Sequence, residues 1–141
     1  LRFNYAFNYT IHIADRMDTG SIIIPPMLIQ PYIENAIWHG LMYRKEPGGM
    51  LTMEVQELND MIKVIVRDNG VGRAASEALK SKSALQQKSY GMKITSERMR
   101  VVNVAYQINA SAEVNDIINE EGLVKGTEVV LTLKKIVQEQ N

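Results

Sequence analysis

The chain of 141 residues contains no cysteine, which excludes disulfides, thiol nucleophiles and zinc–thiolate sites. It has no run of about eighteen apolar residues, so the sequence offers no candidate transmembrane segment. Neither sign of charge is in excess, because 16 Lys and Arg residues balance 16 Asp and Glu residues. A neutral chain gives no electrostatic reason to expect nucleic acid as its main partner.

What is present is typical of a folded domain: 45% hydrophobic and 23% charged residues argue against disorder across the chain. A length of 141 residues corresponds to one domain, so residues 1–141 are expected to fold as a unit. The chain begins at Leu1 with no initiator methionine or signal-peptide pattern, and we expect a piece of a longer protein whose missing part lies upstream.

Apolar periodicity predicts five strands and two helices. Alternation marks the strands and spacing of three to four residues marks the helices. The predicted strands are Asn4–Asp15 (half-buried), Met50–Leu58, Met61–Asp68, Ser111–Ile118 and Gly126–Val137, and the predicted helices are Pro25–Gly40 and Ser96–Ile108. This order favours an α+β fold with one mixed sheet and the helices packed on one face.

The segment from Asn69 to Tyr90 has no sustained apolar face and is rich in Ser, Lys, Ala and Gln. An irregular or mobile segment of this length is unusual in a compact domain and is often an active-site lid. We therefore expect a lid over residues 73–90, and a tail over residues 137–141.

The stretch "PPMLIQPYIENAIWHG" carries Glu34, Asn35 and His39 inside an otherwise apolar predicted helix. Asn35 and His39 are four residues apart and therefore share one helix face, whereas Glu34 lies about 100° away. These groups either mark a solvated side of the helix or face a ligand. An Asn oxygen there suits a hard cation such as Mg²⁺ beside phosphates.

Two further motifs combine glycine with polar residues. In "RDNGVG", Asp68 ends a predicted strand and is followed by Gly70 and Gly72. The motif is either an ordinary turn or a site where the carboxylate accepts a hydrogen bond from a ligand N–H and the glycines let the backbone approach closely. In "KGTEVVLTL", Gly126 and Thr127 precede the last strand, where a hairpin turn is the simpler interpretation.

"SYGMKITSERMR" places Gly91 and Lys93 at the predicted N-terminus of a helix, with Arg98 nearby. Backbone N–H groups at a helix N-terminus, together with basic side chains, bind phosphates. The alternative is an ordinary basic start of a helix.

Together and in this order, the motifs resemble the ATP-binding domain of the GHKL superfamily, which includes gyrase, MutL and the histidine kinases. Within it, "PPMLIQPYIENAIWHG" with "YGMKITSERMR" looks like the sensor histidine kinases of the LytS type. The resemblance runs from Leu1 to about Lys135 and implies a Bergerat-type two-layer α/β sandwich with a mixed, mostly antiparallel sheet. Residues 1–3, "LRF", resemble the end of a connection from upstream dimerisation and phosphoacceptor helices.

The resemblance implies ATP and Mg²⁺ as cofactors. It makes Asn35 the metal ligand and places Glu34 and His39 near the γ-phosphate as catalytic residues. Asp68 would accept the adenine amino group, above a floor that contains Gly70 and Gly72. The remaining cofactor-binding residues would be Gly91, Lys93, Arg98 and Thr127.

This sequence departs from the family pattern at several positions. Ser89 replaces a lid glycine, Ile94 replaces a polar residue, and Trp38 stands where a Lys often helps to hold phosphate. In the ATP-hydrolysing branches, a water-activating Glu lies four residues before the Asn. That place is Pro31 here, which favours a kinase over a hydrolase.

We therefore expect the ATP-binding catalytic domain of a two-component sensor histidine kinase, which donates the γ-phosphate to a histidine on the missing helical domain. The alternatives are a non-catalytic nucleotide-sensing or interaction module of the same fold, and a serine kinase of the anti-sigma type. Neither His12, in a predicted strand, nor His39 suits a phosphoacceptor, so the fragment itself is expected not to autophosphorylate.

The expected partners are the upstream helices and a response regulator, without nucleic acid or direct membrane contact. The fragment is expected to be monomeric and the whole protein a homodimer. We expect a cytoplasmic domain of a membrane-anchored bacterial sensor.

Overall fold

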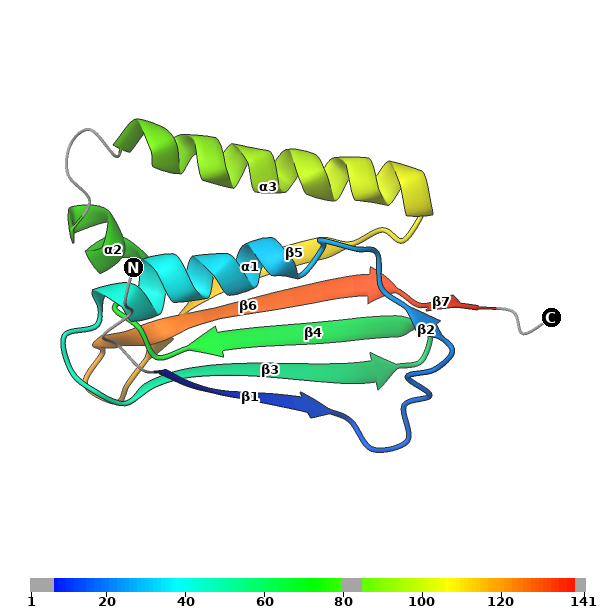
Figure 1. The fold of residues 1–141 in the computed structure, drawn as a ribbon, viewed down its shortest axis with the longest axis horizontal. Coiled ribbons are helices and arrows are strands. Elements are labelled where there is room, and N and C mark those ends of the chain that lie inside the picture. Colours follow the sequence, from blue (N-terminus) through cyan, green and yellow to red (C-terminus); the bar gives the residue numbers. More distant parts are fainter. Residues whose placement is uncertain (1–6, 80–84, 139–141) are drawn as a thin grey trace.

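The structure, a computed structural model, describes residues 7–79 and 85–138, with the side chains of residues 85–94 excluded (Figure 1). It contains seven strands, three α-helices and two short helical turns among these residues. In chain order they are β1 Phe7–Ile13, β2 Ile22–Ile23, α1 Gln30–Asn35, the π-helical turn η1 Ala36–Gly40, the 3-10 turn η2 Leu41–Tyr43, β3 Gly49–Leu58, β4 Met61–Asp68, α2 Arg73–Leu79, α3 Leu85–Tyr106, β5 Ser111–Ile118, β6 Val124–Lys134 and β7 Ile136–Val137.

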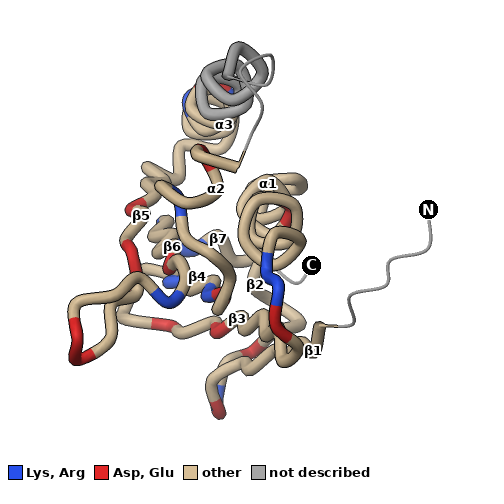
Figure 2. Tube along the Cα trace, turned by 90° about the vertical axis from the view of Figure 1, so that its left-hand side faces the viewer, with Lys and Arg blue, Asp and Glu red and all other residues tan. Residues whose placement is uncertain are grey.

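The main sheet has the strand order β1-β3-β4-β6-β5. β1 pairs with β3 in parallel, and the other neighbouring strands are antiparallel. Helices α1 and α3 lie over one side of the sheet (Figures 1 and 2). The predicted α+β class, the mixed, mostly antiparallel sheet and the one-sided helical layer are confirmed. The short strands β2 and β7, which form a separate pair, were not predicted.

The hydrophobic core lies between α1 with its following turns and the sheet. Its β-branched strand residues suit a pleated, half-buried surface. The buried core residues are Leu28, Tyr32, Ala36, Leu41, Leu51, Val55, Ile62, Val64, Val66, Ile108, Ala110, Val129, Leu131 and Leu133. The core thus fixes the end of β4 beneath the end of the first helical segment, where the site described below is formed.

The opposite face of the sheet carries charge. Arg67 on β4 bonds Glu54 on β3 at 2.7 Å and Glu128 on β6 at 2.6 Å. These three side chains follow the predicted strand alternation, which places charged residues away from the core. This face is therefore the solvated side of the two-layer sandwich.

The first helical segment differs from the predicted helix Pro25–Gly40. It begins at Gln30, with Pro31 rather than Pro25 in its first turn, and Met27 before it has a φ of 62°. After Asn35 the chain continues as the π-helical turn η1 and then as η2 to Tyr43, so Gly40 does not end the helical path. π-helical turns within helices are rare and occur frequently at functional sites.

The expectation of a long irregular segment after Asn69 is wrong for the described residues. α2 occupies Arg73–Leu79, and α3 begins at Leu85 rather than at Ser96. The sequence of α3 is rich in residues with high helix propensity, and a single internal glycine costs a helix only about 1 kcal/mol. Residues 80–84 of the expected lid lie outside the described residues. The assignment of 73–90 as a lid stays a prediction.

β1 is less buried than its alternating pattern predicts. Tyr9, Ile11 and Ile13 are 68%, 59% and 44% exposed, although they share the core-facing side of the sheet with Leu51 and Val55. Alternation indicates which side chains share a face, but not whether another element covers that face. β1 is an edge strand, and its apolar side chains extend beyond the buried core.

Candidate functional site

The site is built around Asp68, the last residue of the buried strand β4. Its backbone lies opposite Thr127 on β6 and Leu51 on β3. Asp68 is only 5% exposed, and Ser76 is the one other buried polar side chain among the described residues. A carboxylate in such a place is costly unless hydrogen-bonded, so its retention at a strand end suggests a binding role.

Burial raises the pKa of the Asp68 carboxyl from 3.8 to about 6, and backbone hydrogen bonds from Gly70 and Thr127 partly offset this rise. The Gly70 amide donates to Oδ1 of Asp68 at 2.9 Å. The group is therefore an ionisable acceptor in a dry setting that is mostly ionised above pH 6. A ligand N–H donor directed at it would relieve part of the desolvation cost.

Three glycines are closely packed at Asp68 and at the loop that follows it. A β-carbon on Gly40 would lie 2.6 Å from Oδ1 of Asp68, and one on Gly126 would lie 1.9 Å from its carbonyl oxygen. A β-carbon on Gly70 would lie 2.3 Å from the carbonyl carbon of Gly40. The predicted role of Gly70 as a point of close backbone approach agrees with this geometry, whereas the sequence pattern did not identify Gly40 as part of the site.

Gly72 has a different requirement. Its φ of 81° lies in the left-handed region, and a β-carbon there would lie 2.5 Å from Cγ1 of Val124 on β6. Gly72 therefore combines a turn conformation with contact to the β5–β6 hairpin.

Asn69 and Arg44 hold the loop that contains the glycines. Asn69 accepts from the Met50 amide at 2.7 Å and donates to the Gly48 carbonyl at 3.0 Å. Arg44 donates to the carbonyl oxygens of Asn69 at 2.7 Å, Glu46 at 3.0 Å and Pro47 at 3.2 Å. Sequence reasoning missed Arg44, because its partner Asn69 is 25 positions away and no local motif marks the contact.

The helical motif "PPMLIQPYIENAIWHG" ends beside Asp68. Gly40, at the end of η1, accepts a hydrogen bond from the Val71 amide at 3.3 Å. Asn35 is half-buried five residues earlier, while His39 and Trp38 are exposed. Glu34 is also exposed, and it accepts a hydrogen bond from Gln30 at 2.8 Å. The structure thus places Asn35 and His39 on the segment that ends against Asp68, and it turns Glu34 toward solvent.

The predicted phosphate site at Gly91, Lys93 and Arg98 is only partly described. Gly91 and Lys93 lie inside α3, six or more residues after its start, so the helix N-terminus expected there is absent. The Lys93 side chain lies outside the described residues. Arg98 lines a small crevice with Met27 at the beginning of the first helical segment, whereas Asp68 lies at its end. The structure does not bring Arg98 and Asp68 together.

The described residues around Asp68 offer a hydrogen-bond acceptor rather than a set of metal ligands. The described residues contain no group of three or more His, Asp or Glu side chains able to hold a metal by themselves. A cation there would take Asn35 and ligand phosphates instead, which is a common coordination for Mg²⁺. The buried Asp68 carboxylate, which already accepts the Gly70 amide, suits a ligand that carries an N–H donor.

Comparison with known proteins finds similar sequences among sensor histidine kinases. The sensor histidine kinase/phosphatase LytS from Staphylococcus aureus strains MRSA252 and Mu50 is 34% identical over 71 residues, which is 50% of this chain and 12% of LytS. The chain thus spans only a small part of these curated relatives. No family model matches the chain.

Solved structures agree on the fold. The mycobacterial sensor histidine kinase MprB superposes with a TM-score of 0.56 at 12% identity, covering 94% of this chain and 84% of that structure. The catalytic domain of the histidine kinase ThkA superposes with a TM-score of 0.51 at 7% identity, covering 91% and 78%. These likenesses show that the chain has the fold of a histidine kinase catalytic domain, and the LytS match over half of the chain supports the resemblance that the motifs predicted.

Proposed function

We propose that this chain binds Mg-ATP and donates the γ-phosphate to a histidine on a separate helical domain of a two-component sensor kinase. The observation that carries the proposal is the buried, ionisable Asp68 at the end of β4, where three glycines pack closely: Gly40, Gly70 and Gly126. Homology to LytS over half the chain supports the same reaction class.

Asp68 would recognise the base. Its carboxylate accepts the amide of Gly70 and retains further acceptor capacity, because a carboxylate has about four acceptor sites. An adenine amino group is a donor of the required kind. Gly70 and Gly126 pack against the backbones of Gly40 and Asp68, and they would thereby fix the carboxylate in place for the base.

Asn35 would hold the cation. Its neutral amide oxygen suits Mg²⁺ that is already bound to phosphate oxygens. Asn35 directly precedes η1, whose last residue, Gly40, packs against Asp68. Mg-ATP supplies the transferable phosphoryl group when bound. Phosphoryl transfer depends mostly on positioning and charge neutralisation, so the chain needs to orient the nucleotide rather than react with it. Glu34 and His39 are the proposed polar neighbours of the γ-phosphate.

The transfer itself would take place on another domain. A P–N bond would form on the acceptor histidine as the P–O bond to ADP breaks, and a response regulator would receive the phosphoryl group afterwards. No helix within residues 7–79 and 85–138 has the length and apolar character needed to cross a membrane. We propose a cytoplasmic position in a membrane-anchored, dimeric sensor, with this domain itself monomeric.

The test mixes the chain with the separately produced helical domain of its parent protein and ATP labelled in the γ-phosphate. We expect Mg²⁺-dependent labelling of the helical domain, lost on acid treatment as phosphohistidine is, and none on the chain alone. The Asn35→Ala variant should abolish the labelling. Acid-stable labelling would indicate a serine kinase instead. Absence of labelling despite ATP binding would indicate a nucleotide-sensing module.

A further inference from the structure

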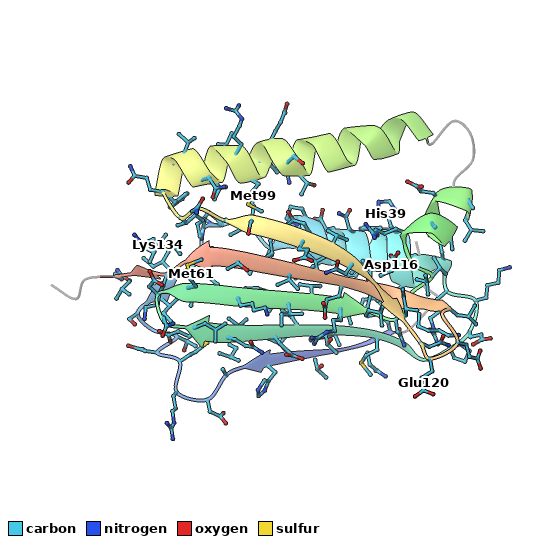
Figure 3. The ribbon with its side chains drawn as sticks, turned by 180° about the vertical axis from the view of Figure 1, so that it is seen from behind. His39, Met61, Met99, Asp116, Glu120 and Lys134 are labelled. Carbon is cyan, nitrogen blue, oxygen red and sulfur yellow. The ribbon has the colours of Figure 1, made fainter. Side chains whose placement is uncertain are left out.

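An ion pair joins the start of α2 to the edge strand β5 of the sheet. Nε of Arg73, the first residue of α2, donates to Oδ1 of Asp116 on β5 at 3.1 Å. The two residues are 43 positions apart in sequence, so the contact fixes tertiary rather than local structure. Figure 3 shows Asp116 on β5, toward the end of the sheet where His39 and α2 lie.

Asp116 belongs to a row of residues that leads to the proposed adenine site. It pairs in register with Thr127 on β6, and Thr127 pairs with Asp68 on β4. All three therefore share the helix-facing side of the sheet, with about 10 Å between the outer strands of the row. The Arg73 guanidinium neutralises Asp116, so this row does not leave two uncompensated carboxylates beside Thr127.

The neighbouring residues of the same loop are fixed by packing. Gly72 contacts Val124 on the β6 side, and on the opposite side the Val71 amide donates to Gly40 at 3.3 Å. The Ser76 amide then donates to the Gly72 carbonyl at 3.0 Å and begins α2. The Arg73–Asp116 ion pair therefore adds a polar contact to the packing that holds the loop of Gly70 and Gly72 between η1 and the β5–β6 hairpin.

We propose that Asp116 is a positioning residue of the nucleotide site. It acts through Arg73 to hold the loop of Gly70 and Gly72 in the position that binding of the base requires. This inference rests on the proposed function. The ion pair suits positioning more than overall stability, because its side chains are 49% and 30% exposed. Ion pairs with such exposure contribute little to the free energy of unfolding. Variants of either residue are therefore expected to stay folded.

The experiment is a double-mutant cycle on the whole chain with two readouts. Kd for Mg-ATP is measured by calorimetry, and amide hydrogen exchange is measured over residues 73–79, for wild type, Arg73→Ala, Asp116→Ala and the double variant. Glu113→Ala is the matched control, because Glu113 lies on the same strand but on the opposite, exposed face.

Each single variant is expected to weaken Mg-ATP binding about fivefold or more, within the range of ordinary coupling between neighbouring elements. The double variant should be no weaker than the weaker single variant, because both changes break one contact. The rate of amide hydrogen exchange over residues 73–79 should rise in both single variants and in the double variant. Glu113→Ala should match wild type in both readouts.

The outcomes separate the inference from the function on which it rests. Wild-type chain that binds no Mg-ATP at millimolar concentration would contradict the proposed function. Wild-type binding with unchanged affinity in Arg73→Ala and Asp116→Ala would overturn only the positioning role. Additive losses in the double variant would also overturn it, since each residue would then act independently of the other.

Discussion

Gly70 lies directly against Gly40, and a β-carbon on Gly70 would come within 2.5 Å of the Cα and carbonyl oxygen of Gly40. The loop after β4 and the end of η1 therefore meet backbone to backbone. This contact fixes the loop directly beside Asp68, because Gly40 also packs against the Asp68 carboxylate.

Substitution of Gly70 by alanine should force these two backbones apart. Overpacking of a well-packed site costs about 1–3 kcal/mol, so we expect a loss of that size in the free energy of unfolding, measured with urea. Nucleotide binding should be lost as well. Gly20→Ala is the control, because its β-carbon would only touch Asp18 at 3.5 Å. Equal stability of the two variants would contradict the close packing.

Arg44 should be a structural requirement of the site. Arg44→Ala leaves three carbonyl oxygens, those of Asn69, Glu46 and Pro47, without their donor. We expect a loss of about 1–3 kcal/mol in the free energy of unfolding and weaker nucleotide binding, because hydrogen bonds from charged donors are the strong ones. Arg100→Ala, an exposed change on α3, provides the comparison and should leave both quantities unaffected.

Asp68 should make the stability of the domain fall as pH rises. Its folded-state pKa of about 6 exceeds the ordinary 3.8, so the native state binds more protons than the unfolded chain between those values. At about 1.4 kcal/mol per pKa unit, the whole contribution is about 3 kcal/mol, of which about 2 kcal/mol is lost between pH 4.5 and pH 7.5. Urea unfolding at pH 4.5 and 7.5 measures it against Asp68→Asn, which lacks this titration. Parallel pH profiles for the two proteins would show that the carboxyl is not perturbed.

Asn35 should control the metal dependence of binding rather than recognition of the base. Asn35→Ala is expected to remove most of the gain in ATP affinity that Mg²⁺ confers, while the affinity for metal-free ADP stays within about twofold, a small free energy. Titrations of both nucleotides with and without Mg²⁺ test this. An equal loss of metal-free ADP affinity would instead indicate that Asn35 supports the pocket itself.

Much of this architecture is readable from the sequence, because alternation and turn chemistry are local signals. The hairpin around Asn59 and Asp60, and Asp68 at a strand end, follow from short patterns. The contacts that shape the site are not local. Arg44 reaches Asn69, and Arg73 reaches Asp116, across 25 and 43 positions.

The boundaries of the helices were harder to predict from the sequence for a different reason. Proline is tolerated in the first turn of a helix, so Pro25, Pro26 and Pro31 were all acceptable starts, and the local sequence does not distinguish among them. The π-helical turn after Asn35 has no sequence signature either. It ends at Gly40, where the close approach to Asp68 is a contact between segments far apart in sequence.

The most direct test of the central claim is calorimetric titration of the chain with Mg-ATP at pH 7.5, beside the Asp68→Asn variant. We expect saturable binding by the wild-type chain and a loss of about tenfold or more in the variant, since a hydrogen bond to a charged group contributes about 1.5–3 kcal/mol. The circular dichroism spectrum of the variant should match wild type. Binding of equal strength by a folded Asp68→Asn chain, or no binding by wild type, would contradict an adenine site at Asp68.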